Sequence, residues 1–397
     1  MSWGILAPDT LISLRRQQNL GLASAVRHFN DCSVPGLGGM WFPMPILWSV
    51  LAVSIAEELR VPALPVGNAI EALMMRQATK EGLADRRVRG IRKMQGLEDW
   101  SFKNLKRRGT YVVQPIRMAM VQPLVALGFV RGSRYGAFTI HTAGAQMLNL
   151  PVMANYRRIL GAWAHGGSPQ GLNKVIEDLS PNAAVPPEVR KLILARLIGG
   201  DDPSTSRRRA LVALGTGPSA SQLDAVEPLS GITPDHWTDL RAGAAFMDLR
   251  NAALAVLYRL EHRLLELRDA NAAAVLSVDE ASNVAALRQY PRQQGDRIDA
   301  RAEATSRKFL SEVRDLSIPQ LLQKLAEREG TVIRWRDGRI GLGPAADEMS
   351  ASGENEPVKD AEFAPQLFRL YNLHCVATEL NGRVNPGCQD SADEEPA

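Results

Sequence analysis

The strongest pattern along the chain is an unbroken apolar run, PILWSVLAVSIA, at residues 45–56. Two prolines, Pro43 and Pro45, introduce it, and two glutamates, Glu57 and Glu58, follow it. Proline is well suited to the first turn of a helix, where its missing N–H costs no hydrogen bond. The run is too short to cross a bilayer. It therefore predicts a buried helix over about residues 46–60.

Weaker patterns surround this helix in the first 150 residues, which we interpret as one domain. The glycine-rich stretch VPGLGGM (34–40) is interpreted as a turn, because it lacks the Lys-Ser/Thr pair of a phosphate-binding loop. The other elements expected here are helices near 10–29, 69–81 and 115–127, a loop at 61–68, and a basic stretch of poor periodicity at 85–109.

A long helix is predicted in the second half of the chain. Thr233, Pro234 and Asp235 form a helix start, with a capping side chain, a proline and an acid in the first turn. The helix is expected to run to about residue 271. Apolar residues recur along it at spacings of three and four: Phe246, Leu249, Ala253, Leu257, Leu260, Leu264 and Leu267. This stripe predicts either packing within the chain's own helical bundle or a seam with a protein partner, such as a homodimer through residues 246–267.

The remaining segments are predicted as shorter elements. Residues 199–209 and 215–221 are rich in Gly, Pro and Ser and are typical of linkers. Further helices are expected at 300–316 and 319–329. Residues 331–342 form a hairpin pattern, because Asp337-Gly338 suits a type I′ turn.

The fold class expected is mainly α, with an N-terminal winged-helix domain followed by a helical region that carries a small β-hairpin. The segments after the first domain are short helices and linkers at 151–230, a helical domain at 231–342, a linker at 343–362, a terminal helix at 363–380 and a disordered tail at 381–397.

Composition adds constraints on location and chemistry. The 397 residues are 45% hydrophobic, 23% charged and only 6% aromatic, an ordinary balance for a globular protein. Three cysteines, Cys32, Cys375 and Cys388, make no disulfide framework and fit a reducing compartment. The first residues do not form a secretory signal. We therefore expect a cytoplasmic protein with no membrane segment.

One stretch, LGFVRGSRYGAFTIHTAG at 127–144, joins two short apolar segments through a tip rich in glycine and arginine. With the helix expected before it, this stretch resembles the winged-helix superfamily, a variant of helix-turn-helix DNA-binding domains. The resemblance spans about residues 68–148 and matches no named subfamily. It implies that the helix at 115–127 enters the major groove and that the wing lies along the adjacent backbone.

Charge supports this interpretation independently. From Gly82 to His141 the chain has twelve basic and three acidic residues, a net charge of +9, whereas the whole chain is +4. Such asymmetry is the electrostatic signature of a nucleic-acid-binding segment. The residues expected to contact double-stranded DNA are Arg86, Arg87, Arg89, Arg92, Lys93, Lys106, Arg107, Arg108, Gln114, Arg117, Gln122, Arg131, Arg134 and Tyr135.

Two alternatives remain open. The outer face of the helix at 115–127 carries Met118, Val121 and Val125, which suits protein docking by an interaction subunit of a bacterial nucleic-acid-related complex. Glu98, Asp99 and Lys103 resemble the residues of a metal-dependent nuclease, but the strand that should carry them is missing. No other catalytic motif is found, no cofactor is expected, and the Cys and His residues lack the paired short spacings of a zinc site.

Overall fold

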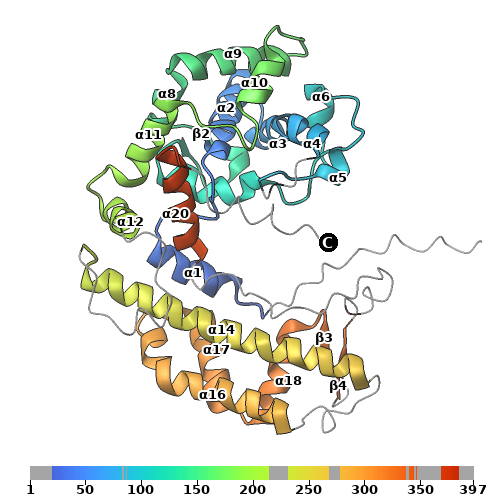
Figure 1. The fold of residues 1–397 in the computed structure, drawn as a ribbon, viewed down its shortest axis with the longest axis vertical. Helices are drawn as coiled ribbons and strands as arrows, with labels where there is room; N and C mark the ends of the chain where they lie inside the picture. Colours follow the sequence, from blue (N-terminus) through green and yellow to red (C-terminus); the bar gives the residue numbers. More distant parts are fainter. Residues whose placement is uncertain are drawn as a thin grey trace, which may run out of the picture. The chain divides into compact units, whose positions relative to one another are not determined.

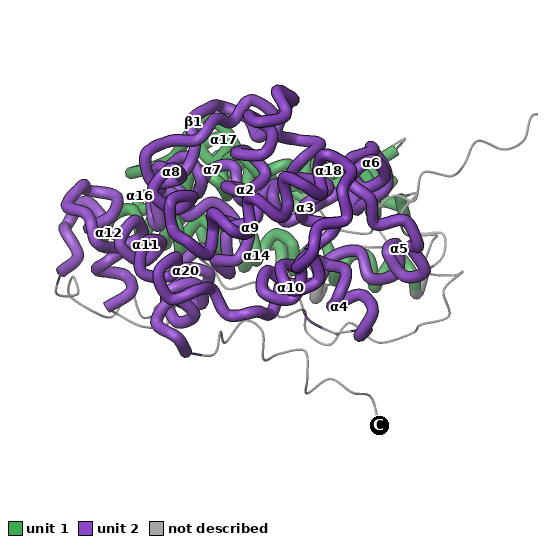
Figure 2. The backbone as a smooth tube through the Cα atoms, turned by 90° about the horizontal axis from the view of Figure 1, so that it is seen from above, with its two compact units in different colours: residues 1–29, 219–227, 237–366 green, residues 30–218, 228–236, 367–397 purple. Residues whose placement is uncertain are grey.

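The computed structural model describes residues 20–82, 85, 87–213, 231–267, 278–336, 339–343, 346 and 368–383. The protein is mainly helical, as predicted, and the described residues form two small antiparallel sheets of two strands each (Figure 1). The chain divides into two compact units (Figure 2). Unit 2 comprises residues 30–218, 228–236 and 367–397, and unit 1 comprises residues 1–29, 219–227 and 237–366.

Two helices contain a boundary between the units, α1 (Ala23–Ser33) and α14 (Pro234–Leu267). The other elements of unit 2 are α2 (Met44–Leu59), α3 (Ala63–Met74), α4 (Arg76–Glu81), α5 (Ile91–Met94), α6 (Phe102–Leu105), the 3₁₀ helix η1 (Ile116–Met120), α7 (Val121–Ala126), β1 (Val130–Arg131), the 3₁₀ helix η2 (Tyr135–Ala137), β2 (Thr139–Ile140), α8 (Thr142–Leu148), α9 (Pro151–Ala164), α10 (Leu172–Asp178), α11 (Pro187–Ile198), α12 (Pro203–Ala213) and α20 (Phe368–Leu380). Unit 1 adds α16 (Val278–Asp299), α17 (Ala304–Asp315), α18 (Ile318–Glu329), β3 (Ile333–Arg336) and β4 (Arg339–Leu342).

The predicted buried helix is α2, and it forms the centre of unit 2. Every residue from Met44 to Ala56 is buried, and α3, α8, α9, η1 and β2 pack around it. The helix ends at Arg60, which adopts a left-handed conformation (φ 55°) and donates its N–H to the Glu57 carbonyl, while Val61 N–H reaches the Ala56 carbonyl. This paired arrangement is a Schellman motif. It turns the chain sharply, and Pro62 prevents the helix from continuing.

Two predicted loops are wrong because helix starts were missed. The expected loop at 61–68 is largely the first part of α3, which tolerates Pro65 because first-turn N–H groups have no helical partner. The expected linker at 199–209 contains the start of α12, where the Asp202 carboxylate accepts a hydrogen bond from Thr205 N–H (3.0 Å). The predicted linker at 215–221 lies outside the described residues.

The expected helix at 115–127 is broken into η1 and α7. Pro123 has no N–H to donate to the Ala119 carbonyl, and Gly39 N–H occupies that carbonyl instead (3.3 Å). The glycine-rich stretch 34–40 is thus a turn that packs on this segment. At Gly38, a Cβ would come within 2.7 Å of the Pro123 ring.

Helix α16 was not predicted, because its apolar side is concealed in the sequence. From residue 284 onward, where burial is described, its buried positions are Val284, Leu287, Pro291, Gly295 and Ile298. They have a helical spacing, and a proline and a glycine occupy two of these five positions. Hydrophobic periodicity therefore does not reveal it.

The helices predicted at 300–316 and 319–329 are confirmed as α17 and α18. Strands β3 and β4 pair with Arg336 opposite Arg339, as a hairpin requires, although Asp337 and Gly338 themselves lie outside the described residues. The helix predicted near 10–29 is wrong at residues 20–22, which are not helical; α1 begins at Ala23 and continues to Ser33, and residues 10–19 lie outside the described residues. After residue 342, the structure describes residues 343, 346 and 368–383, and the last of these ranges contains α20.

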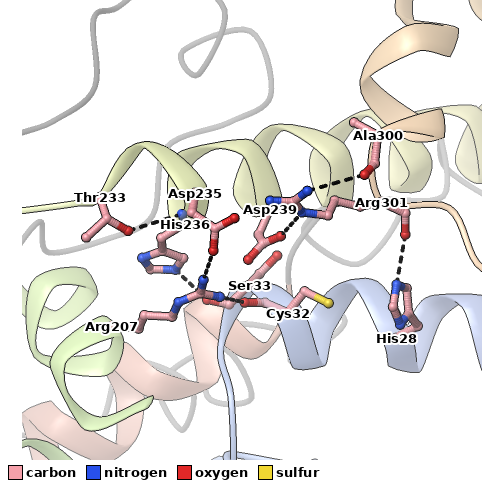
Figure 3. A network of polar contacts seen from close by, with 10 residues as sticks. All are labelled: His28, Cys32, Ser33, Arg207, Thr233, Asp235, His236, Asp239, Ala300 and Arg301. Carbon is pink, nitrogen blue, oxygen red and sulfur yellow. Dashed lines mark hydrogen bonds and ion pairs between the residues drawn. The ribbon is translucent and has the colours of Figure 1, made fainter. Parts of the chain in front are cut away.

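The end of α1 is held by side chains within unit 2 (Figure 3). Arg207 donates to the Cys32 carbonyl (2.9 Å), and His236 Nε2 donates to the Ser33 carbonyl (2.8 Å). The last carbonyls of a helix lack intrahelical partners, so such donors stabilise the helix end. Within unit 1, Arg301 contacts the Asp239 carboxylate while its carbonyl accepts a hydrogen bond from His28 Nε2 (2.8 Å).

The apolar stripe of α14 is buried inside the chain. Phe246, Leu249, Ala253, Leu257 and Leu260 are each fully buried, and the Phe246 ring stacks on that of Phe29 at 4.6 Å. The interpretation as packing in the chain's own bundle is confirmed for these residues. A dimer seam along the stripe is not supported, because its side chains are already covered.

Leu257→Ala is expected to lower the free energy of unfolding by about 2–5 kcal/mol, because it leaves a cavity in a packed core. Leu265→Ala, on the same helix but 42% exposed, is the control and should change it by about 0.5 kcal/mol or less. Urea denaturation measures both. The midpoint of thermal unfolding should not depend on protein concentration. If it rises with concentration in the wild type but not in Leu257→Ala, the interpretation of the stripe as a dimer seam is correct after all.

Candidate nucleic-acid interface

The basic stretch folds into two one-turn helices, α5 and α6, that lie beside α4 and α3 (Figure 1). Four apolar side chains, Val88, Met94, Phe102 and Leu105, are buried and fix the stretch to unit 2. Its described basic side chains that are exposed are Arg89, Arg92, Lys93, Lys103, Lys106, Arg107 and Arg108. The only exposed carboxylates among the described residues 85–108 are Glu98 and Asp99. A strongly positive surface results.

Not every arginine of the stretch is available to a ligand. Arg87 forms a two-pronged ion pair with Asp85: Nη2 donates to Oδ2 (2.7 Å) and Nε donates to Oδ1 (3.1 Å). Only 13% of the Arg87 side chain is exposed. Arg86 lies outside the described residues. We therefore define the basic face as the seven exposed residues Arg89, Arg92, Lys93, Lys103, Lys106, Arg107 and Arg108.

Arg117 was expected to face the groove, but it is a structural residue. Its guanidinium contacts the carboxylate of Glu71 on α3 (3.3 Å) and donates to the side-chain carbonyl of Asn68 (3.1 Å). Glu71 is fully buried and also accepts hydrogen bonds from the N–H groups of Ile116 (2.6 Å) and Arg117 (3.2 Å). One carboxylate thus caps the start of η1 and neutralises the arginine.

Burial sets the protonation chemistry of this cluster. Desolvation raises the pKa of Glu71 above its ordinary value, and the charge of Arg117 with the two backbone donors offsets part of that rise. Tyr111, which is also buried, has a pKa well above its ordinary value because of burial and the nearby charge of Glu71. The tyrosine hydroxyl therefore stays protonated at neutral pH.

A cavity of about 420 Å³ opens beside this cluster. Leu64 and Val113, which are 49% and 90% exposed, line its open side. Lys106 and Arg108 contribute positive charge to its wall, and Arg117 contributes its guanidinium. The cavity thus combines apolar walls with positive charge.

The stretch at 127–144 folds as a hairpin, with Val130 opposite Ile140 and Arg131 opposite Thr139. Helix α7 precedes it and α8 follows it. Its strands have only two residues each. The Glu57 carboxylate on α2 accepts a hydrogen bond from Ile140 N–H (2.9 Å) and holds the second strand in place.

A buried side chain fixes the tip of this hairpin to α3. Tyr135, expected at the surface, is buried; its ring lies over Gly67 of α3, where a Cβ would come within 2.6 Å. Burial raises the pKa of Tyr135 to about 12, and its hydroxyl bonds to Ser49. Phe138 packs against the tyrosine ring at 5.4 Å. Arg131 and Arg134 remain exposed, as expected of a wing.

The helical segment before the hairpin presents mostly apolar side chains. Met118 and Val125 are 63% and 40% exposed. Gln114 is exposed, but Gln122, expected to face the groove, is half-buried and donates to the Asp31 carboxylate (2.6 Å). The surface that a recognition helix would present is therefore poor in groups that read base edges.

Of the three residues that resemble a nuclease set, Asp99 has a local role. The Asp99 carboxylate accepts a hydrogen bond from Ser101 N–H (2.9 Å), and its pKa is lowered chiefly by hydrogen bonding with Ser101. Ser101 in turn caps α6. No group of three or more His, Cys, Asp and Glu residues suited to a metal ion occurs within the described part of the chain.

Sequence reasoning missed Glu71, Asn68 and the cavity. Glu71 is the single acid in the otherwise apolar ALPVGNAIEALM of α3, a signal that a buried partner of opposite charge exists. The cavity left no comparable signal, because α3, the end of α6 and residues 111–113 meet there from separate parts of the chain.

Comparisons of the chain with protein-family models, with curated proteins and with solved structures found no match. In the part of the chain that the structure describes, no helix has both the length and the hydropathy needed to span a membrane.

Glu71→Ala is expected to lower the free energy of unfolding by about 3–5 kcal/mol, because it leaves Arg117 without its partner in a buried setting. Glu58→Ala is the matched control: Glu58 lies 3.7 Å from Arg157, and both side chains are 45% exposed. Removing that pair should cost about 1 kcal/mol or less. Equal losses in the two variants, measured by urea denaturation, would contradict the role assigned to Glu71.

Proposed function

We propose that unit 2 binds double-stranded DNA through the basic face, without catalysing a reaction on it. The observation that carries the proposal is the exposure of seven cations beside only two exposed carboxylates in the described residues 85–108. Phosphates attract such a surface at long range, and release of counterions from DNA drives the binding. The anchored apolar side chains beneath these cations keep them on one rigid support.

The wing adds charge near the same place. Gly136 on the tip lies against Leu64, in the first turn of α3, and Leu64 also lines the cavity whose wall includes Lys106 and Arg108. The tip and the end of α6 therefore flank the same turn of α3. Arg131 and Arg134 at the tip would extend the phosphate-binding surface beyond the basic face.

The runner-up function is docking of a protein partner. Met118, Val125 and Val113 are exposed apolar side chains in or beside the segment expected to enter the groove. A groove-reading helix normally presents polar groups to base edges, so this surface favours a partner protein over sequence-specific readout. The DNA proposal accordingly depends on phosphate contacts and not on base contacts.

The affinity for a random duplex is expected to fall steeply with salt, with a log–log slope of about −5 to −6 if most of the seven cations neutralise a phosphate. Arg92→Ala with Lys93→Ala should reduce the size of this slope by about 1–2 units. Arg307→Ala with Lys308→Ala removes a matched exposed Arg-Lys pair from α17 in unit 1 and should leave the slope unchanged. Absence of duplex binding at low salt, measured by fluorescence anisotropy, would remove the proposal.

The wing and the apolar surface can be separated by a second set of variants. Arg131→Ala with Arg134→Ala should weaken binding to all duplexes alike and leave stability within about 1 kcal/mol, because both side chains are exposed. Met118→Asp and Val125→Asp should change DNA affinity only slightly. If the arginine variant instead binds DNA normally while the aspartate variants lose a co-purifying partner, protein docking is the function of this region.

A further inference from the structure

The cavity beside α3 shares part of its wall with the basic face. Lys106 and Arg108 belong to both. A phosphate backbone that follows the basic face would therefore pass the opening of the cavity. Its volume of about 420 Å³ lies within the range of about 300–1,000 Å³ that small-molecule sites occupy.

The interior of the cavity suits a flat, largely apolar group. Leu64, Pro65, Val112 and Val113 supply apolar walls. Arg117 adds a planar guanidinium that Glu71 and Asn68 hold in one orientation. Only 11% of the Arg117 side chain is exposed, but the part of it that lines the cavity is already fixed in place and so loses little freedom when a base contacts it.

We infer that this cavity binds one unpaired base of a nucleic acid whose phosphates lie along the basic face. The inference rests on the proposed function and names the part of the ligand that the cavity takes: a nucleotide at a single-stranded end or at an opened base pair. The side-chain amide of Asn68 already donates to the Leu105 carbonyl (2.7 Å) and accepts from Arg117. These bonds fix the amide and leave it at most one N–H and one lone pair for the edge of a base, so we expect only a weak preference among the bases.

A peptide with an apolar anchor and acidic neighbours has related chemistry. The structure favours the nucleotide because the other five exposed cations of the basic face lie outside the cavity lining, where a chain of phosphates can meet several of them and one anionic group cannot. The peptide remains an outcome that the experiment below can reveal.

The test compares a blunt duplex with the same duplex carrying a short 5′ overhang whose first base is 2-aminopurine. The overhang duplex should bind about tenfold more tightly, an increment typical of one stacked base. The emission of 2-aminopurine should change on binding, because the base leaves its stack on the duplex. Both measurements use the full-length wild-type chain.

Two aspartate substitutions provide the matched control. Leu64→Asp places a carboxylate in the cavity wall, whereas Val61→Asp places one three residues earlier, at a position that is 43% exposed and outside the lining. Val61 lies just before α3 and Leu64 in its first turn, so both substitutions add the same charge near the start of the helix and their long-range effects on phosphates are similar. Leu64→Asp should abolish the tenfold preference for the overhang, and Val61→Asp should retain it.

The outcomes distinguish failure of the inference from failure of the proposed function. If the blunt duplex binds with the expected salt dependence but the overhang adds nothing, or if both aspartate variants reduce the preference equally, the cavity does not take a base and the function stands. If neither duplex binds at low salt, both are overturned. If Leu64→Asp leaves the overhang preference intact but releases an acidic protein bound to the wild type, the cavity is a peptide site.

Discussion

The need to cover α2 on all sides organises unit 2. A helix that is apolar around its whole circumference cannot lie at a surface, and thirteen consecutive buried residues, Met44–Ala56, make α2 such a helix. The short elements around it, including η1, β2 and α8, exist as a covering layer. Their shortness follows from this role, because each needs only enough apolar residues to cover one part of the central helix.

The same constraint sorts the charged residues into two kinds. Residues on elements packed close to α2 have their polar groups turned inward and paired, as Glu71 and Arg117 are, or satisfied within the core, as the Tyr135 hydroxyl is by Ser49. Residues on α5 and α6, which lie beside α3 and α4, have only a few apolar anchors and leave their cations in solvent. The net charge of a sequence segment therefore overstates the number of charges that a ligand can contact, because it also counts those that are paired and buried.

This sorting explains what the sequence could predict. Long, regular patterns were sufficient for α2, for the stripe of α14 and for the β3–β4 hairpin, because each depends on local residues. Positions that depend on distant partners were not accessible: the hydrogen bond from Gly39 that replaces the one Pro123 cannot make, the glycine at 67 that admits Tyr135, and the pairing of Arg117 with Glu71. In α16, Pro291 and Gly295 concealed a regular helix. The exposed cations were predictable as a group, but the cavity beside them was not.

The mixture of exposed apolar groups and cations around the first turn of α3 has a physical consequence for any ligand. Added salt screens the attraction between cations and phosphates and removes the gain from counterion release, whereas contacts made by Leu64 and Val113 do not depend on charge. A ligand that uses both should therefore retain part of its affinity at a salt concentration that releases a ligand bound by phosphates alone. The structure makes these two contributions separable because Lys106 and Arg108 stand in the cavity wall while Arg92 and Lys93 stand away from it. For a nucleic acid, a salt dependence weaker than its phosphate contacts alone would give therefore indicates apolar contacts in the cavity.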